Sequence, residues 1–188
     1  MARILIVYAS RHGQTRKIAE RLEAILRGEG HSADLVDASI SILRPIVGYG
    51  AYILASAVNY GKHLPAMVRF VRDHLSDLES APSLFLSVSA SAASRQGRAD
   101  AEKCIEEFMS ETGWRPTVCL PVAGAMKYTK YPWLMRMVLR SIVKRTGGEH
   151  AGDIDTSRDY EYTDWAELER FVADFLSVQA IRPSPVLL

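Results

Sequence analysis

The sequence has little cysteine and no long hydrophobic run. Its 188 residues include only two cysteines, Cys104 and Cys119, which form no C-x-x-C pair and lie near no histidine cluster. We therefore expect no metal site and no disulfide, but two buried thiols in a reducing compartment. The apolar run Ile4–Tyr8 is too short for a signal peptide. No stretch reaches the roughly 20 apolar residues that span a bilayer, so the sequence predicts a cytoplasmic protein, either free or resting on a membrane.

Charge is balanced over the whole chain but unevenly distributed along it. The chain carries 23 Lys and Arg against 22 Asp and Glu, a net charge of +1, and 48% of its residues are hydrophobic. These values are typical of one soluble globular domain and exclude a disordered chain. Residues 112–148, the basic block, contain no acidic residue and seven basic ones, which leaves 16 basic and 22 acidic residues elsewhere, a net of −6. The seven are Arg115, Lys127, Lys130, Arg136, Arg140, Lys144 and Arg145.

Strand and helix patterns alternate along the chain. Runs of β-branched and apolar residues predict five strands, and residues at helical spacing between them predict helices. The last helix is expected to start near Thr163, with Thr163 as its N-cap. This alternation predicts an α/β protein with a doubly wound, five-stranded parallel sheet. We expect one domain over residues 1–178 and a frayed tail over 179–188. The expected strands are 4–8, 33–36, 52–55, 84–88 and 118–122, and the earlier helices end at Gly28–Gly30, run through Met67–Leu75, and cover about Ala99–Glu111.

Three loops follow the carboxyl ends of predicted strands, where ligands bind in such sheets. They cover residues 9–15, 56–63 and 89–98. The first loop lies at a helix N-terminus, so its backbone N–H groups and hydroxyls suit an anion such as a monophosphate. The dinucleotide motif G-x-G-x-x-G and the Walker A motif are both absent. An ordinary turn with Thr15 as N-cap is the alternative. The anion-binding residues would be Ser10, Arg11, His12, Gly13, Gln14 and Thr15.

The basic block contains the pattern of an amphipathic helix that begins near Pro132. At 100° per residue, Arg136 and Arg140 fall on one arc, with apolar residues on the opposite half and Trp133 beside the basic residues. Such a helix suits the surface of an anionic membrane. Packing on the sheet or against a second copy of the chain is the alternative. Nucleic-acid binding is not expected, because the block has no recognition motif and its aromatic residues cluster at one end.

Taken together, the three loops resemble those of the flavodoxin-like fold. That resemblance implies that the first loop holds the phosphate of FMN. It also implies that the other two loops border the isoalloxazine ring, with Tyr60 as the stacking aromatic. The residues that would border the ring are Ser56, Ala57, Val58, Asn59, Tyr60 and Gly61, together with Ser89, Ala90, Ser91, Ala92 and Ala93.

Several segments together resemble one family within this fold. The chain is similar to the flavodoxin-like, quinone (menaquinone)-dependent protoporphyrinogen IX dehydrogenases of bacterial haem biosynthesis. The resemblance covers nearly the whole chain, and the insertion after strand five, about 124–160, is its most specific feature. The segments that carry it are Ser10–Arg16, Ala55–Gly61, Trp114–Pro116, Ala123–Ala125, Gly147–Glu149 and Tyr162–Trp165.

The family resemblance implies an oxidoreductase. Protoporphyrinogen IX would lose six electrons through FMN, and a membrane quinone would accept them. A peripheral protein on the cytoplasmic face of the inner membrane is implied as well. His63 is a candidate proton acceptor by its location, although a surface histidine is the alternative. Residues expected to meet substrate propionates or lipid phosphates are Lys127, Lys130, Trp133, Arg136 and Arg140.

Other functions fit the same fold. They are a soluble flavodoxin-type electron carrier, an NAD(P)H-dependent quinone reductase, and a membrane-binding module without a cofactor. Electron carriers of this type usually have an acidic docking face, whereas this chain adds a basic, apolar insertion. The fold alone does not choose among these functions, and the sequence leaves homo-oligomer formation open.

Overall fold

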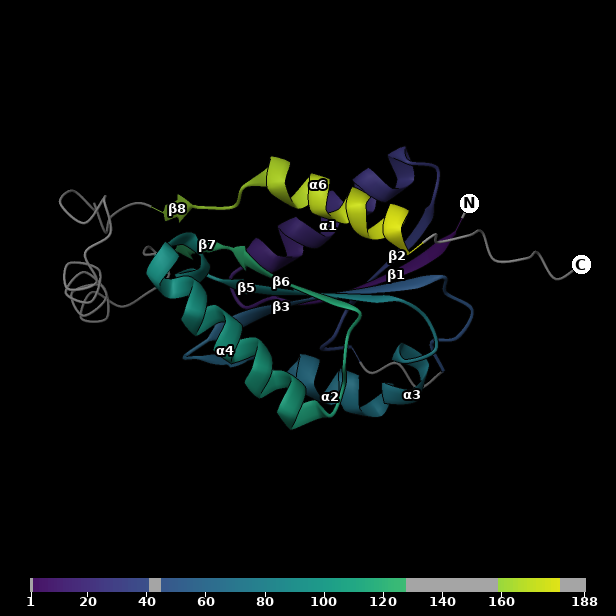
Figure 1. Cartoon of the computed structure of the whole chain (residues 1–188), viewed down its shortest axis with the longest axis horizontal. Coiled ribbons are helices and arrows are strands. Elements are labelled where there is room, and N and C mark those ends of the chain that lie inside the picture. The colour runs from purple at the N-terminus through teal and green to yellow at the C-terminus, as the bar shows by residue number, and fades with distance from the viewer. Residues whose placement is uncertain (1, 41–44, 128–158, 180–188) are drawn as a thin grey trace, which may run out of the picture.

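The structure, a computed structural model, describes residues 2–40, 45–127 and 159–179. Five parallel strands form the centre of the molecule, where Figure 1 shows them between two layers of helices. They pair in the order β2-β1-β3-β5-β6. This order confirms the predicted doubly wound parallel sheet and places its switch point between β1 and β3. The strands are β1 (Arg3–Ala9), β2 (Ser32–Asp37), β3 (Ala51–Asn59), β5 (Ser83–Ser89) and β6 (Val118–Ala123).

Helices cover both faces of the sheet. In Figure 1, α1 (Gln14–Gly28) and α6 (Trp165–Val178) lie on one side, and α2 (Pro65–Asp73), α3 (Leu75–Leu78) and α4 (Arg95–Thr112) lie on the other. The helix predicted from Met67 to Leu75 is two helices, because His74 leaves helical geometry with φ −123° and ψ 22°.

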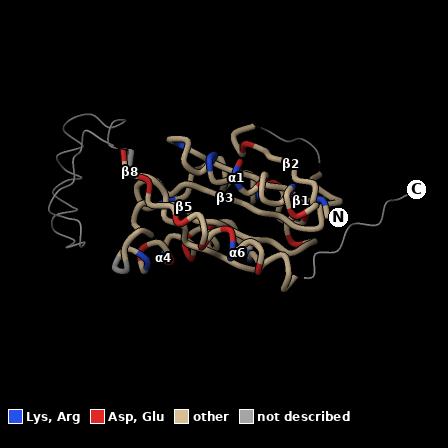
Figure 2. The backbone as a smooth tube through the Cα atoms, turned by 90° about the horizontal axis from the view of Figure 1, so that it is seen from above, with Lys and Arg blue, Asp and Glu red and all other residues tan. Residues whose placement is uncertain are grey.

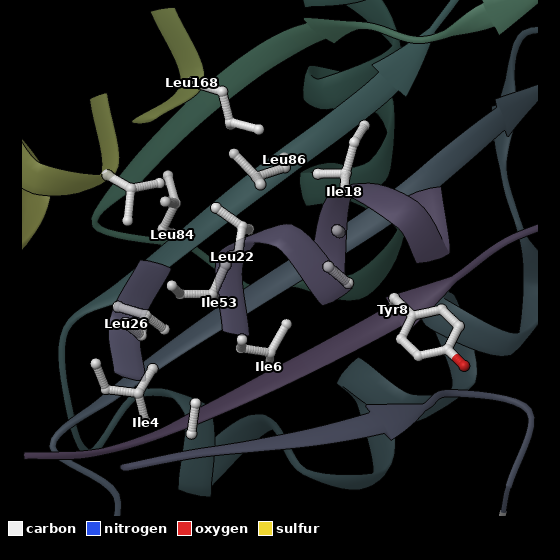
Figure 3. Packing of buried hydrophobic residues seen from close by; sticks show 14 of the residues in the cluster. Ile4, Ile6, Tyr8, Ile18, Leu22, Leu26, Ile53, Leu84, Leu86 and Leu168 are labelled. Carbon is white, nitrogen blue, oxygen red and sulfur yellow. The ribbon is translucent and has the colours of Figure 1, made fainter. Parts of the chain in front are cut away.

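Each strand alternates its side chains between two cores. In β1, Ile4 and Ile6 face α1 and α6, whereas Leu5 and Val7 belong to the core beneath α2 and α4. Because both faces are buried, the strand reads in sequence as an unbroken apolar run. Figure 3 shows how the first core is filled, with α1 lying over residues of three strands. Its labelled residues are Ile4, Ile6, Tyr8, Ile18, Leu22, Leu26, Ile53, Leu84, Leu86 and Leu168.

The predicted loop 56–63 is wrong in its local structure. β3 continues to Asn59 and pairs antiparallel with β4 (Lys62–His63), with Val58 opposite His63. Tyr60 and Gly61 form the two-residue turn, with φ 52° and 76°. Turns of this kind are usually recognised by Asn-Gly or Asp-Gly, and a Tyr-Gly pair does not give that signal.

The third loop also contains more structure than predicted. Ser91–Ala93 form a short 3₁₀ helix, and α4 begins at Arg95 rather than at about Ala99. The Ser94 hydroxyl accepts a hydrogen bond from the Gly97 N–H and caps this helix. This cap starts the helix one turn before its apolar periodicity begins. The apolar pattern therefore predicted a helix start that was too late.

The prediction of two buried thiols is only partly correct. Cys104 and Cys119 are free, but each is half-buried rather than buried. Cys119 lies on β6, the edge strand of the sheet, and Cys104 lies on α4 beside the Gly61 carbonyl. Cys119 remains partly exposed because it lies at the sheet edge, and Cys104 remains partly exposed because it lies on an outer helix.

The insertion predicted at about 124–160 begins and ends in a two-stranded antiparallel ribbon. β7 (Ala125–Lys127) pairs with β8 (Asp159–Glu161). The amphipathic helix predicted in the basic block, with Lys130, Trp133, Arg136 and Arg140, lies outside the described residues, as does most of the predicted tail. Of the helices that the structure describes, none combines the length and the apolar character needed to cross a membrane.

The N-cap of the last helix is Asp164, so the prediction of Thr163 is wrong. The Asp164 carboxylate accepts a hydrogen bond of 2.9 Å from the Glu167 N–H. The Thr163 hydroxyl instead donates to the Ala123 carbonyl, 2.8 Å away. The two neighbouring residues are both good caps by type, and a long-range bond decides between them.

Replacing Asp164 with alanine should therefore lower the free energy of unfolding by about 1 kcal/mol, the usual cost of losing an N-cap. Urea denaturation of the purified protein measures the change. The matched control is Asp174→Ala, which removes the same exposed side chain near the other end of α6, where a negative charge opposes the helix dipole. Equal losses in the two variants would contradict the cap assignment.

Candidate cofactor and substrate site

A cavity of about 290 Å³ opens at the carboxyl ends of the parallel strands. It brings together the three loops that the sequence analysis singled out, although they lie far apart in the chain. Residues at the ends of β5 and β6 complete its wall. The lining residues are Ser10, Arg11, His12, Gln14, Thr15, Ala57, Val58, Asn59, Tyr60, Val88, Ser89, Ala90, Gly124 and Ala125.

The polar end of the cavity is the N-terminus of α1. Gly13 occupies the N-cap position with φ 90°, and no side chain caps the helix. The Gly13 N–H donates instead to the Ser10 hydroxyl at 3.0 Å. Thr15 lies within the helix and is buried against the cavity, so the alternative of an ordinary turn capped by Thr15 is wrong. Uncapped N–H groups and the positive end of the helix dipole give this end the chemistry of an anion site.

Arg11 differs from the other basic residues near this helix. Arg16 pairs with Glu20, and Lys17 and Arg21 pair with acidic residues of the C-terminal segment. Figure 2 shows acidic and basic residues interspersed along the described chain. Arg11 is exposed, lines the cavity and makes no ion pair with any other described residue. Its guanidinium therefore remains available to an anion in the cavity.

The other end of the cavity is apolar and carries an exposed aromatic ring. Ala57, Val58, Val88 and Ala90 line this part, and Tyr60 stands at its edge with 76% of its surface exposed. A positive φ costs a tyrosine roughly 1–2 kcal/mol, so its conformation at this turn is strained. Strained residues cluster at ligand sites, and an exposed ring beside an apolar slot suits stacking on a flat ligand.

Gly124 brings the ends of β5 and β6 together in the cavity wall. A Cβ on Gly124 would lie 3.0 Å from Val88 Cγ1, so a side chain would force the wall to shift. Its N–H donates to the Ser89 carbonyl, and its carbonyl accepts from the Tyr162 N–H, both at 2.9 Å. Gly124, Ala125 and Val88 are cavity residues that the sequence analysis missed. The Ala-Gly-Ala motif after strand five was the available signal for the first two.

Two linked hydrogen bonds join three segments around the polar end of the cavity. The Gln14 side-chain amide donates to the Thr163 hydroxyl at 3.0 Å, and that hydroxyl donates to the Ala123 carbonyl at 2.8 Å. Gln14 and Thr163 are both buried. The start of α1, the end of β6 and the segment before α6 are thereby held at fixed positions.

Six of the predicted cofactor residues do not line the cavity. Gly13 turns its N–H to Ser10, and Ser56 is fully buried within β3. In the third loop, the Ser89 hydroxyl accepts hydrogen bonds from Ser91 Oγ and from the Ala92 N–H. These residues shape the loops, and a direct role in cofactor binding stays a prediction for each. The six are Gly13, Ser56, Gly61, Ser91, Ala92 and Ala93.

His63 is buried, so the alternative of a surface histidine is wrong. Its ring lies 5.0 Å from Phe85 and 4.9 Å from Phe108, centroid to centroid, and Nε2 is 3.4 Å from Ser87 Oγ. It does not line the cavity. Burial lowers the pKa of His63 from 6.5 to about 4, so the ring is neutral at physiological pH. Its role as a proton acceptor stays a prediction.

Comparison with known proteins relates the chain to one group. The flavodoxin domain family matches residues 5–153. A protein of Escherichia coli strain K12 named protoporphyrinogen IX dehydrogenase [quinone] is 32% identical over 171 residues, covering 90% of this chain and 92% of the relative. A Leishmania major protein of the same name is 29% identical over 184 residues, covering 96% and 78%. A mutant flavodoxin from Pseudomonas aeruginosa has a similar fold, with a TM-score of 0.53 at 13% identity over 95% of this chain and 99% of that one.

The buried His63 predicts a pH dependence of stability. In the unfolded chain the His63 side chain takes up a proton near pH 6.5, whereas in the folded protein it takes one up only near pH 4. Between these values the unfolded state binds more protons, so the free energy of unfolding falls as the pH drops from 6.5 towards 4. The loss from this residue is at most roughly 3 kcal/mol. Chemical denaturation at several pH values should show this slope in the wild type and a shallower one in His63→Gln. Identical slopes in the wild type and in His63→Gln would contradict the lowered pKa of His63.

Proposed function

The chain belongs to the flavodoxin domain family, among the quinone-dependent protoporphyrinogen IX dehydrogenases, and we propose that it oxidises protoporphyrinogen IX to protoporphyrin IX with FMN as cofactor and a quinone as acceptor. The observation that carries this function is the extent of the relationship. It covers nearly the whole chain rather than the phosphate loop alone. The quinone-reductase and electron-carrier alternatives are therefore not favoured.

The residues of the cavity fit FMN. The uncapped N-terminus of α1, with Ser10, Arg11 and Thr15 beside it, would hold the phosphate. The apolar slot next to Tyr60 would hold the flat ring, and its small side chains Ala57 and Ala90 leave room for it. One cavity therefore has both the charged and the apolar end that this cofactor requires.

When bound, FMN supplies the two-electron redox chemistry that links the porphyrinogen to the quinone. The chain contributes position and environment. Tyr60 would cover the ring, while Val58 and Val88 would exclude water from its other contacts. The oxidation removes six electrons and six protons from each porphyrinogen, in three two-electron steps, so three quinones become quinols.

We propose in addition that the chain contacts an anionic membrane. Both proposed reactants favour it, because the quinone is lipid-soluble and the porphyrinogen is largely apolar with two propionates. The basic block would meet lipid phosphates or these propionates through Lys127, Lys130, Arg136 and Arg140, with Trp133 at the interface. A peripheral location on the cytoplasmic face of the inner membrane follows from this proposal. Homo-oligomer formation remains a prediction from the sequence.

An anaerobic assay tests the main function. The protein loaded with FMN is mixed with protoporphyrinogen IX, and the flavin absorbance and porphyrin fluorescence are followed. We expect the flavin to bleach, to recover when a quinone is added, and porphyrin to form in step. Flavin that stays oxidised with porphyrinogen but bleaches with NADPH would overturn the proposal in favour of a quinone reductase. A protein that remains colourless with excess FMN would indicate a module without a cofactor.

Membrane contact predicts the effect of removing four charges. The variant with glutamine at Lys127, Lys130, Arg136 and Arg140 should bind anionic vesicles at least tenfold more weakly, since each basic residue near such a surface contributes about 1 kcal/mol. Co-sedimentation with anionic and zwitterionic vesicles measures this binding.

A charge-matched control separates the basic block from net charge. It carries glutamine at the exposed residues Arg69, Arg72, Lys103 and Arg170 and should bind vesicles as the wild type does. If the first variant kept both its vesicle binding and its KM for porphyrinogen without vesicles, the block would have neither proposed role. A change confined to KM would assign the block to the propionates.

A further inference from the structure

Cys104 touches the turn that carries the exposed Tyr60 ring. Its Sγ lies 3.2 Å from the Gly61 carbonyl oxygen, within reach of an S–H hydrogen bond. Burial, and then the charges of Glu107 and Asp100, raise the pKa of this thiol above its ordinary value. The sulfur therefore keeps its proton at neutral pH and acts as a donor.

The turn needs support from outside itself. Tyr60 and Gly61 both have positive φ, which a tyrosine rarely adopts. The hairpin behind them is short, with only Val58 and Asn59 of β3 paired to Lys62 and His63 of β4. Because Tyr60 is 76% exposed, its own side chain gains little packing that would hold the conformation.

Helix α4 supplies this support at two points one helical turn apart. Phe108 packs its ring against His63, at the base of the hairpin. Cys104, four residues earlier, contacts the Gly61 carbonyl at the tip. Residues spaced by four lie on one face of a helix, so a single face of α4 supports both the base and the tip of the hairpin.

We propose that Cys104 is a positioning residue, whose thiol holds the Gly61 carbonyl and thereby keeps the Tyr60 ring in place to stack on the flavin of FMN. The proposal rests on the proposed function in one respect, that FMN occupies the cavity. It concerns cofactor geometry and does not depend on which substrate is oxidised.

The other cysteine provides a matched control. Cys119 is also free and half-buried, but it lies on the edge strand β6 and its thiol makes no hydrogen bond with any described residue. Burial raises the pKa of its thiol to about 11, so it is protonated as well. Replacing either cysteine with alanine removes the same atoms, and only one of the two changes removes a contact to the turn.

Titration of the apoprotein with FMN, followed by flavin fluorescence, tests the proposal. Stacking on tyrosine quenches the flavin, so the emission of bound FMN reports the position of Tyr60. In Cys104→Ala we expect brighter bound FMN and a dissociation constant raised about two- to tenfold, as for the loss of one hydrogen bond. Cys104→Ser, which retains a donor, should lie close to the wild type. Cys119→Ala should leave both quantities unchanged.

A double-mutant cycle identifies the route of the effect. If Cys104 acts through Tyr60, then Cys104→Ala should change neither fluorescence nor affinity in a Tyr60→Leu background. An effect of equal size in both backgrounds would overturn the proposal, because it would show a general loss of packing. Cys104→Ser behaving like Cys104→Ala would overturn it too, since the volume of sulfur rather than its proton would then matter.

The same titration distinguishes loss of FMN binding by the wild type from loss of the Cys104 effect. Wild-type protein that binds no FMN would refute the proposed flavin-dependent function. Wild-type protein that binds FMN, with Cys104→Ala indistinguishable from Cys119→Ala in affinity and fluorescence, would refute the role of Cys104 alone. Urea denaturation of the apoprotein variants shows that each is folded before titration.

Discussion

The Thr163 hydroxyl is the constraint on which the cavity depends. It accepts a hydrogen bond from the Gln14 amide and donates one to the Ala123 carbonyl, in a position shielded from water. One hydroxyl thus satisfies the buried Gln14 donor and the half-buried Ala123 acceptor, from segments far apart in the chain. An unpaired polar group at this depth would cost about 1–3 kcal/mol. The start of α1 can therefore move relative to β6 only by breaking this pair of bonds, and the polar end of the cavity keeps a fixed distance from Gly124.

Rigidity at the polar end contrasts with strain at the apolar end. The segments around the start of α1 are joined by the hydrogen bonds of Gln14 and Thr163. The ring of Tyr60, in contrast, is mostly exposed on a turn with positive φ. Such a conformation persists only where neighbouring contacts hold it. The cavity therefore combines a polar end held by hydrogen bonds with an exposed aromatic ring on a hairpin that packs against α4.

The sequence was sufficient for the features that depend on local pattern. Apolar runs and helical spacing predicted all five parallel strands, and the first loop was identified because it lies between β1 and α1. Features that depend on long-range contacts were missed. Thr163 and Asp164 are equally good caps by type, and the long-range hydrogen bonds of the Thr163 hydroxyl, to the Ala123 carbonyl and from the Gln14 amide, leave the cap to Asp164. The hairpin at Tyr60 was missed because its turn residues lack the usual signal, and burial of His63 depends on Phe85 and Phe108 from two later elements.

The two-stranded ribbon at the ends of the insertion is attached to the cavity wall through both of its strands. β7 starts at Ala125, a lining residue, and β8 leads into Tyr162, whose N–H bonds the Gly124 carbonyl. Between them, Glu161 accepts hydrogen bonds from Lys17 of α1 and from the Trp165 indole of α6. The hydrogen bond from Lys17 is the main cause of the lowered pKa of Glu161, so the Glu161 carboxylate stays ionised at neutral pH. The two strands at the base of the insertion are therefore joined both to the cavity wall and to α1, whose N-terminus lines the cavity. The proposed membrane contact would therefore lie beside the cavity, because both ends of the insertion are attached to its wall.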